Sequence, residues 1–391
     1  MMLLLQLCFL LVAAVVGVGS STTGRAGGSG RRPSSSAGAS KFPTLVTVGA
    51  NASLPEQRAA QELAAYLNNI SASSSFTVQP ATAARKATPQ IAVGYDATIL
   101  LGVHPGELAS LGLEGILAST NLSRGVPAGS AALAGSKGAP RGALYAMVEL
   151  LEAIGVQFLD RLPGGTQLPA ALPAALPPLD RSFTPPLEYR QQYQFGCNNY
   201  GAAGTGAPGG VGDVTMDWNI HRRLNKATLS GESPTAAFGS SVVYASPPGF
   251  VHTSYALLGT KLNAGRGPPP SLFKTHNEWF WPRNDPTEYG QLCWSNASML
   301  QFIIGNLKEQ LETQPEATIV SVSQNDNHNQ CQDPAELKIN EAEGTPGGAL
   351  FRAVNVIADA LKDSFPHVAV DTLACETRTV LVPPLLRCCA G

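Results

Sequence analysis

Charged residues are scarce in this sequence. Asp, Glu, Lys and Arg make up 14% of its 391 residues, and 26 basic side chains nearly balance 28 acidic ones. No run of Lys or Arg stands out on an aromatic-bearing strand or helix. Because nucleic-acid binding depends on such clusters of positive charge, we expect no nucleic-acid partner.

Cysteine is also scarce. One of the seven, Cys8, lies in a hydrophobic leader, and the others are Cys197, Cys293, Cys331, Cys375, Cys388 and Cys389. That number is too small for a disulfide scaffold, so any bridge staples a core that already exists. The pairing cannot be read from the sequence.

Several motifs of common enzyme classes are missing. The sequence contains no GxxxxGK[ST], no GxGxxG after a predicted strand and no GxSxG, which argues against nucleotide-binding folds and a serine hydrolase. Asp326, His328, Cys331 and Asp333 lie close together, but their spacing matches neither a zinc site nor an EF-hand loop. We therefore expect no metal and no other cofactor.

The one long hydrophobic run covers residues 3–18, and the small residues after it supply a plausible cleavage site. This pattern predicts a signal peptide over 1–19, followed by a Ser/Gly-rich disordered linker over 20–41. Two alternatives stay open, an uncleaved membrane anchor and import into an organelle. They arise because no basic residue precedes the run, while arginines and no acid follow it up to Glu56.

The expected location is secreted, extracellular or lumenal, with no membrane contact after cleavage of the leader. Four Asn-x-Ser sequons are compatible with this route. The candidate glycosylation sites are Asn51, Asn69, Asn121 and Asn296.

Glycine and proline, by contrast, are abundant at 40 and 30 residues, and 44% of the chain is hydrophobic. This composition is typical of a loop-rich globular protein, and the length is sufficient for two domains. We place the first domain over 42–162 and the second over 187–375. A Pro/Ala-rich, extended linker over 163–186 separates them.

Hydrophobic periodicity predicts alternating strands and helices in both domains. In the first domain, strands are expected at 45–48, 75–78, 90–93 and 156–159, and helices at 55–67 and 141–154. In the second, strands are expected at 187–195, 238–245, 292–295, 317–323 and 367–373. Its helices are expected at 213–225, from a cap at Ser298, and from a cap at Thr345, with a polar loop over 324–344. The pattern predicts an α/β protein, in which a small α/β domain precedes an incomplete (β/α)8 TIM-type barrel.

Several segments are familiar. Residues 141–145 (RGALY) with 151–156 (LEAIGV) resemble the end of the small N-terminal domain shared by bacterial-type α-glucuronidases and β-hexosaminidases. His252, 276–280 (HNEWF), 291–296 (QLCWSN) and 321–327 (SVSQNDN) together resemble a glycoside-hydrolase-like barrel family known as domain of unknown function 4838. The resemblance covers about 45–373 and implies a carbohydrate substrate.

The sequence departs from that family in two ways. Many members carry Cys-x-Cys-x-x-Cys after the aspartate, whereas here Cys331 stands alone, so no cysteine–metal site is implied. Members also continue beyond the strand at 367–373. A complete barrel needs about 250 residues, so we expect a truncated barrel with an aberrant tail over 376–391.

Glycosidases need two carboxyl groups beside the scissile bond, and in barrels these follow strand ends. Asp326 follows the strongest predicted strand and is the first catalytic candidate, with an Asx-turn as the structural alternative. Glu278 lies among aromatic residues that could stack on a sugar ring and is the second. Its alternative is a surface loop anchored by those aromatics.

Other polar residues around these two are predicted to bind substrate. His252, His276, Asn325 and Asn327 could bind sugar hydroxyls, and Arg222 or Arg223 could clamp a uronate carboxylate. A lone histidine is more often structural, and the arginines could equally form ion pairs.

The leading hypothesis is a glycoside hydrolase acting on uronic-acid or amino-sugar polysaccharides. Two alternatives remain: a non-catalytic carbohydrate-binding or cell-surface protein, and an inactive fragment of the enzyme.

Overall fold

The computed structural model describes residues 41–139, 141–160, 164–190, 218–225, 228–229, 238–239, 242–250, 252–259 and 267–373. The predicted signal peptide, nearly all of the Ser/Gly-rich linker and the predicted tail lie outside these ranges. So do most of the strand expected at 187–195 and the first part of the helix expected at 213–225. No helix in the described ranges is both long and apolar enough to cross a membrane.

The first compact region is built on a six-stranded sheet with the order β2-β1-β3-β5-β4-β8. Its strands are β1 (Leu45–Val48), β2 (Thr77–Pro80), β3 (Ile91–Val93), β4 (Ile116–Ser119), β5 (Ala131–Ala134) and β8 (Asp180–Phe183). The first four in the spatial order run parallel, whereas β4 is antiparallel to both β5 and β8. The segment expected to be a linker thus supplies an edge strand, β8.

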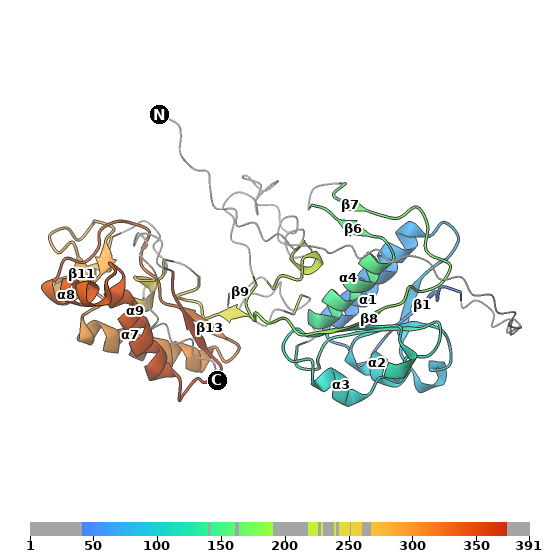
Figure 1. The fold of residues 1–391 in the computed structure, drawn as a ribbon. Helices are drawn as coiled ribbons and strands as arrows, with labels where there is room; N and C mark the ends of the chain where they lie inside the picture. Colours follow the sequence, from blue (N-terminus) through green and yellow to red (C-terminus); the bar gives the residue numbers. More distant parts are fainter. Residues whose placement is uncertain are drawn as a thin grey trace, which may run out of the picture. The chain divides into compact units, whose positions relative to one another are not determined.

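Helices cover both faces of this sheet (Figure 1). Helices α1 (Leu54–Ile70) and α4 (Arg141–Ala153) lie side by side on one face, and α2 (Tyr95–Leu101) and α3 (Pro105–Ala109) lie on the other. Alternate residues of β3 enter the two layers, since Ile91 and Val93 pack toward α1 and α4 while Ala92 packs toward α2. This period of two is the one a strand imposes. A short hairpin of β6 (Gln157–Phe158) and β7 (Thr166–Gln167) follows α4.

A buried polar network extends from α4. Arg141 is fully buried and donates hydrogen bonds to the Tyr145 hydroxyl and to the carbonyl oxygens of Leu224 and Phe238, at 2.6, 2.7 and 2.8 Å. Glu114, also buried, pairs with Arg190. Burial raises the pKa of Tyr145 to about 12, so the phenol stays neutral. Every cation here has acceptors, as a buried charge requires.

The second compact region holds a four-stranded sheet with the order β14-β13-β10-β9. The strands are β9 (Thr228–Leu229), β10 (Val243–Tyr244), β13 (Ile319–Ser321) and β14 (Ala369–Asp371). All of their pairings are parallel, and their spatial order follows the chain. Successive parallel neighbours without a reversal are the arrangement of a (β/α) barrel wall. The described strands form an open sheet and do not close into a barrel.

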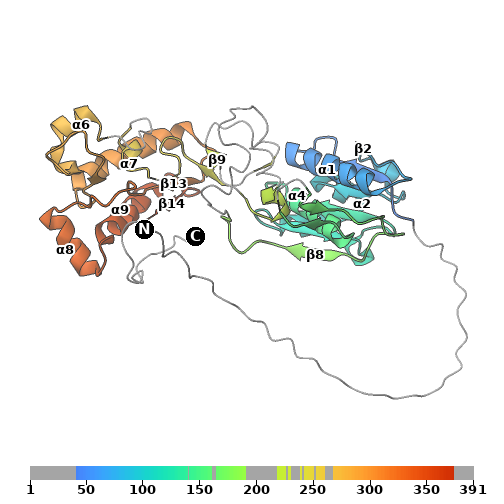
Figure 2. The ribbon, with the colours of Figure 1, turned by 90° about the horizontal axis from the view of Figure 1, so that it is seen from above.

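Helices α7 (Ala297–Thr313) and α9 (Gly348–Leu361) pack on one face of this sheet, against Val320, Val322 and Val370 (Figure 2). Helix α6 (Pro270–Thr275), the antiparallel hairpin of β11 (Phe280–Trp281) and β12 (Gln291–Leu292), and helix α8 (Pro334–Glu343) fill the connections.

The α/β class is therefore confirmed, and several local predictions are wrong. The strand expected at 292–295 is β12, a hairpin strand rather than part of the parallel sheet. The loop expected at 324–344 contains α8, whose apolar face is weak. Asn296 rather than Ser298 caps α7, and α9 begins after Gly347, beyond the expected cap at Thr345.

Helix α4 and β4 approach each other so closely that only glycine fits at Gly142. A Cβ atom there would lie 2.1 Å from the Gly115 carbonyl oxygen, a backbone atom that cannot move aside. We expect Gly142→Ala to lower the free energy of unfolding by about 1–3 kcal/mol. The matched control is Gly138→Ala, where a Cβ meets nothing within 4 Å. Equal urea midpoints for the two variants would contradict this packing.

His221 links pH to stability. Its ring is 8% exposed and stacks on Phe158 at 3.9 Å. Burial, with help from Arg223 and Arg58, lowers its pKa to about 4. Between the ordinary value and this one, the unfolded chain takes up a proton that the folded chain refuses, so stability falls as the pH falls through this window.

We expect a loss of about 3 kcal/mol between pH 6.5 and 4 from this group. His221→Phe keeps an aromatic ring on Phe158 and should flatten the curve of unfolding free energy against pH. His367→Gln, which removes an exposed histidine, serves as the control. An identical pH dependence in the His221 variant would refute the linkage.

Candidate functional site

Polar residues gather where β10, β13 and β14 end. His252 lies on the segment after β10, Asp326 lies on the loop after β13, and Asp371 is the last residue of β14. The carboxyl ends of parallel strands lie at one edge of their sheet, and that edge is where α/β proteins bind ligands. This edge is therefore the candidate site.

Asp326 presents its carboxylate to solvent, with its side chain 63% exposed. Its Oδ2 lies 3.8 Å from Nε2 of His252. The Nδ1 atom of His252 is 3.0 Å from the Gln324 carbonyl oxygen, which fixes the ring orientation. When Nδ1–H donates to this carbonyl, Nε2 is the basic nitrogen, and it faces the carboxylate. The pair is an acid–imidazole contact that solvent reaches at this edge.

The backbone at His252 is strained, with φ at +55°. Its two following residues hold it in place. The hydroxyl of Thr253 donates to the Ser321 carbonyl oxygen and that of Ser254 to the Ser323 carbonyl oxygen, both at 2.8 Å. Positive φ outside glycine is uncommon and often marks functional sites.

Asn325 and Asn327, which we expected to bind sugar hydroxyls, instead use their amides within the protein. Both Nδ2 groups donate to the Gly290 carbonyl oxygen, at 2.7 and 3.1 Å. The Gln291 amide donates to the Asn325 and Asn327 carbonyl oxygens at 2.7 and 3.1 Å and accepts the Asn325 N–H at 3.0 Å. These contacts attach the Asp326 loop to the β11–β12 hairpin, so the asparagines position Asp326.

Asp371 was missed by our sequence reasoning. Its Oδ2 accepts a 2.5 Å hydrogen bond from the Tyr244 hydroxyl, and its Oδ1 is closed off from solvent. Burial raises the pKa of Asp371, although the hydrogen bond from Tyr244 opposes the shift. Burial and the nearby carboxyl charge also raise the pKa of Tyr244. The sequence feature that could have identified Asp371 was an acid near the carboxyl end of the strand expected at 367–373.

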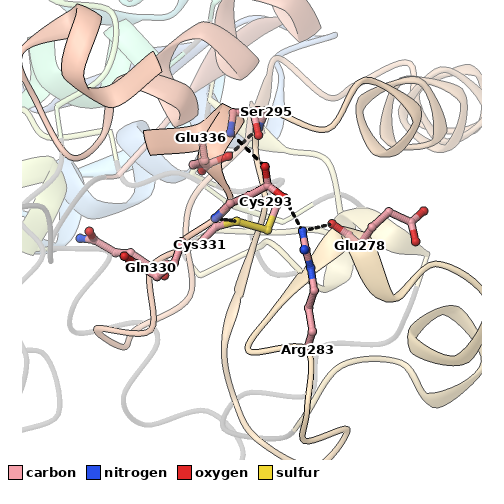
Figure 3. Close-up of a disulfide and its surroundings, with 10 residues drawn as sticks. Glu278, Arg283, Cys293, Ser295, Gln330, Cys331 and Glu336 are labelled. Carbon is pink, nitrogen blue, oxygen red and sulfur yellow. Dashed lines mark hydrogen bonds and ion pairs between the residues drawn. A yellow bond between two sulfur atoms is a disulfide. The ribbon is translucent and has the colours of Figure 1, made fainter. Parts of the chain in front are cut away.

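Glu278 and His276 form a second acid–imidazole contact, on the turn before β11. His276 Nδ1 lies 3.6 Å from Glu278 Oε1, and the histidine ring stacks on Trp279 at 4.0 Å. Glu278 is 52% exposed, and its side chain points away from the neighbouring disulfide (Figure 3). Within the described residues, no hydrogen bond or ion pair joins Glu278 to Asp326.

A disulfide lies between the hairpin and the loop that leads to α8. Cys293 and Cys331, 38 residues apart and both buried, form it (Figure 3). Nearby, Glu336 accepts the Ser295 N–H at 2.7 Å, and burial raises the pKa of Glu336. A cavity of about 20 Å³ lined by Gln324 and Glu336, among others, has room for one water molecule rather than a sugar.

The two arginines expected to bind a uronate lie against other side chains. The Arg223 guanidinium pairs with Glu149 at 2.8 Å and Glu152 at 2.6 Å, both on α4. Arg222 lies 5.6 Å from the centroid of the Trp218 ring. Arg223 thus forms ion pairs within the protein, which is the structural alternative to binding a uronate.

The sequons differ in accessibility. Asn51 and Asn69 are exposed. The Asn121 amide donates to Asp180 at 2.8 Å, and the Asn296 side chain accepts the Met299 N–H at 3.0 Å to cap α7. A glycan on Asn121 would compete with its hydrogen bond, so the first two sites are better acceptors. Within the described ranges, no three His, Cys, Asp or Glu residues gather as a metal site would require.

Comparison with known proteins gives one match. The family model described as a domain of unknown function (DUF4838) matches residues 163–385, more than half of the chain. That range contains His252, Asp326, Asp371 and the disulfide. A search of curated proteins finds no match.

Removing the disulfide tests whether it stabilises the loop and hairpin. For a closed loop of 38 residues, chain entropy predicts a loss of about 4 kcal/mol in the double variant Cys293→Ser, Cys331→Ser. Urea unfolding measures the loss, and treating the double variant with reductant provides the control, since it should cause no further change. Unchanged unfolding in the double variant would show that the bridge carries no stability.

Proposed function

The chain belongs to the family of domain of unknown function 4838, and we propose that it is a glycoside hydrolase with Asp326 as a catalytic carboxylate. The observation that carries the proposal is the exposed Asp326 carboxylate beside His252, at the carboxyl edge of a parallel sheet. Such edges hold the catalytic residues of (β/α) barrels.

The architecture supports this reading. Four parallel strands in chain order, with helices on one face, are an arrangement that a segment of a (β/α)8 wall would also have. We propose that the sheet is a segment of such a barrel, and that its polar strand ends line the substrate site.

The proposed hydrolysis requires few catalytic groups. A glycosidase stabilises positive charge at the anomeric carbon with one carboxylate and protonates the leaving oxygen with another carboxyl. Asp326 is suited to the first role, because its carboxylate reaches solvent while its loop is held by Gln291. His252 can orient that carboxylate or bind a sugar hydroxyl.

The proposed substrates are glycans that contain uronic acids or amino sugars. This choice rests on the resemblance of the first region to the N-terminal domain of α-glucuronidases and β-hexosaminidases. Glu278, His276 and Trp279 offer an exposed acid, an imidazole and an indole on one turn, a combination suited to binding a sugar.

A secreted or lumenal location goes with this function. The disulfide supports it, because such bridges persist in oxidising compartments. The exposed sequons at Asn51 and Asn69 support it too.

The test is a panel of aryl glycosides and oligosaccharides of glucuronic acid, galacturonic acid and N-acetylhexosamines, assayed with the full chain. Asp326→Asn should lower kcat about 10²- to 10⁴-fold on any substrate that the protein cleaves. Asp363→Asn, which changes an exposed acid after α9, should leave the rate unchanged.

Turnover by Asp326→Asn at the wild-type rate would remove Asp326 from the mechanism. Binding of a glycan without turnover by the wild-type protein would favour the alternative, a carbohydrate-binding protein.

A further inference from the structure

The face of the second sheet opposite α7 and α9 carries its own set of side chains. Along β13 the alternation sends Val320 and Val322 toward the helices and Ile319 and Ser321 to the other face. Asp371 pairs with Ser321 in the register of β13 and β14, so it stands on this second face as well. In a barrel wall this face is the interior.

Tyr244 fixes the Asp371 side chain on that face. The tyrosine comes from β10 and reaches past β13 to donate its 2.5 Å hydrogen bond to Asp371 Oδ2. Ser321, on β13, has a small side chain, which leaves room for this contact. The Tyr189 ring packs edge-on against Tyr244 at 6.2 Å, and Phe250 lies 5.2 Å from it. The phenol is therefore held from two sides.

Asp371 ends β14, and Asp326 lies on the loop after the neighbouring strand, β13. Asp371 is level with Ser321, and Asp326 follows Ser321 by five residues on the loop beyond. One carboxyl is thus set into the sheet face, and the other is exposed to solvent on the loop. Glycosidases differentiate their two carboxyls by such a contrast of environments.

We propose that Asp371 is the proton-donating carboxyl of this site, positioned by Tyr244, and that Asp326 is its carboxylate partner. The inference rests on the proposed function and deepens it, because it replaces Glu278 as the second catalytic residue. Glu278 stands exposed on a turn with a histidine of its own.

In the proposed step the O–H bond of Asp371 breaks, and its proton passes to the glycosidic oxygen. The bond between that oxygen and the anomeric carbon breaks with its electron pair on oxygen, so the leaving sugar departs as a neutral alcohol. Water then adds to the anomeric carbon, and the proton it loses restores a carboxyl group. No oxidant, reductant or metal is needed for this balance.

The electrostatics agree with the assignment. Burial raises the pKa of Asp371, and a general acid must keep its proton near the working pH. Among the described residues, the groups that face it are the Tyr244 phenol from β10 and the Ser321 hydroxyl from β13, with Tyr189 behind Tyr244. The Tyr244 hydrogen bond lowers the pKa of Asp371, so its removal should raise that pKa further.

The experiment compares leaving groups in the full chain. Asp371→Asn should lose about 10²- to 10⁴-fold in kcat/KM on a methyl glycoside or oligosaccharide, whose leaving alcohol needs a proton. On a 2,4-dinitrophenyl glycoside of the same sugar, which leaves without protonation, the loss should be within tenfold. Asp326→Asn should lose activity on both, Asp371→Glu should partly restore cleavage of the poor leaving group, and Asp363→Asn is the control.

A second measurement does not depend on the aspartate variant folding. Because activity falls as the general acid loses its proton, Asp371 sets the basic limb of the profile of kcat/KM against pH. Tyr244→Phe should move that limb to higher pH.

The outcomes separate the two proposals. An active wild type with equal losses for both leaving groups in Asp371→Asn, or with no loss, overturns the role of Asp371 and leaves the glycosidase standing. So does an unmoved basic limb in Tyr244→Phe. A wild type that cleaves no glycan in the panel overturns the proposed function and this inference together.

Discussion

The candidate site depends on the side-chain amide of Gln291. This one buried amide makes hydrogen bonds to the backbone of both residues that flank Asp326. Leaving such a group without partners costs about 1–3 kcal/mol, so the loop cannot move away from the hairpin cheaply. The Cys293–Cys331 bridge joins the same hairpin to the chain just beyond the loop. An exposed carboxylate on a loop tied at both ends is preorganised, which catalytic geometry requires.

Much of the fold was predictable because its strands and helices bury one face and expose the other. Helices α1, α7 and α9 show that period, and so they were found. Strands β4 and β5 were missed; they are buried on both faces and show no alternation, and their sequences, ILAS and AALA, are poor in β-branched residues. Strand β8 was missed for the opposite reason, since all four of its residues are exposed and only pairing with β4 makes it a strand.

The candidate site likewise contains residues that could be predicted from the sequence and residues that could not. The position of Asp326 could be predicted, because an acid shortly after a strong strand lies at the carboxyl edge of a parallel sheet. The roles of Asn325 and Asn327 could not, since Gln291 is more than thirty residues away in the chain. The contact between Tyr244 and Asp371 spans 127 residues, and the disulfide spans 38. Each of these depends on which strands become neighbours, which local patterns do not encode.

Along the strands, the side chains on the second face of the β9–β14 sheet change from apolar to polar, and this change bears on function. Toward the amino ends it carries Val242 and Ile319, which pack as an apolar cluster. One step further toward the carboxyl edge it carries Ser321 and Asp371. A parallel sheet covered by helices on both faces carries near-continuous hydrophobic runs. On the described part of this face the polar side chains lie at the carboxyl edge, which supports the proposed binding of a polar ligand there.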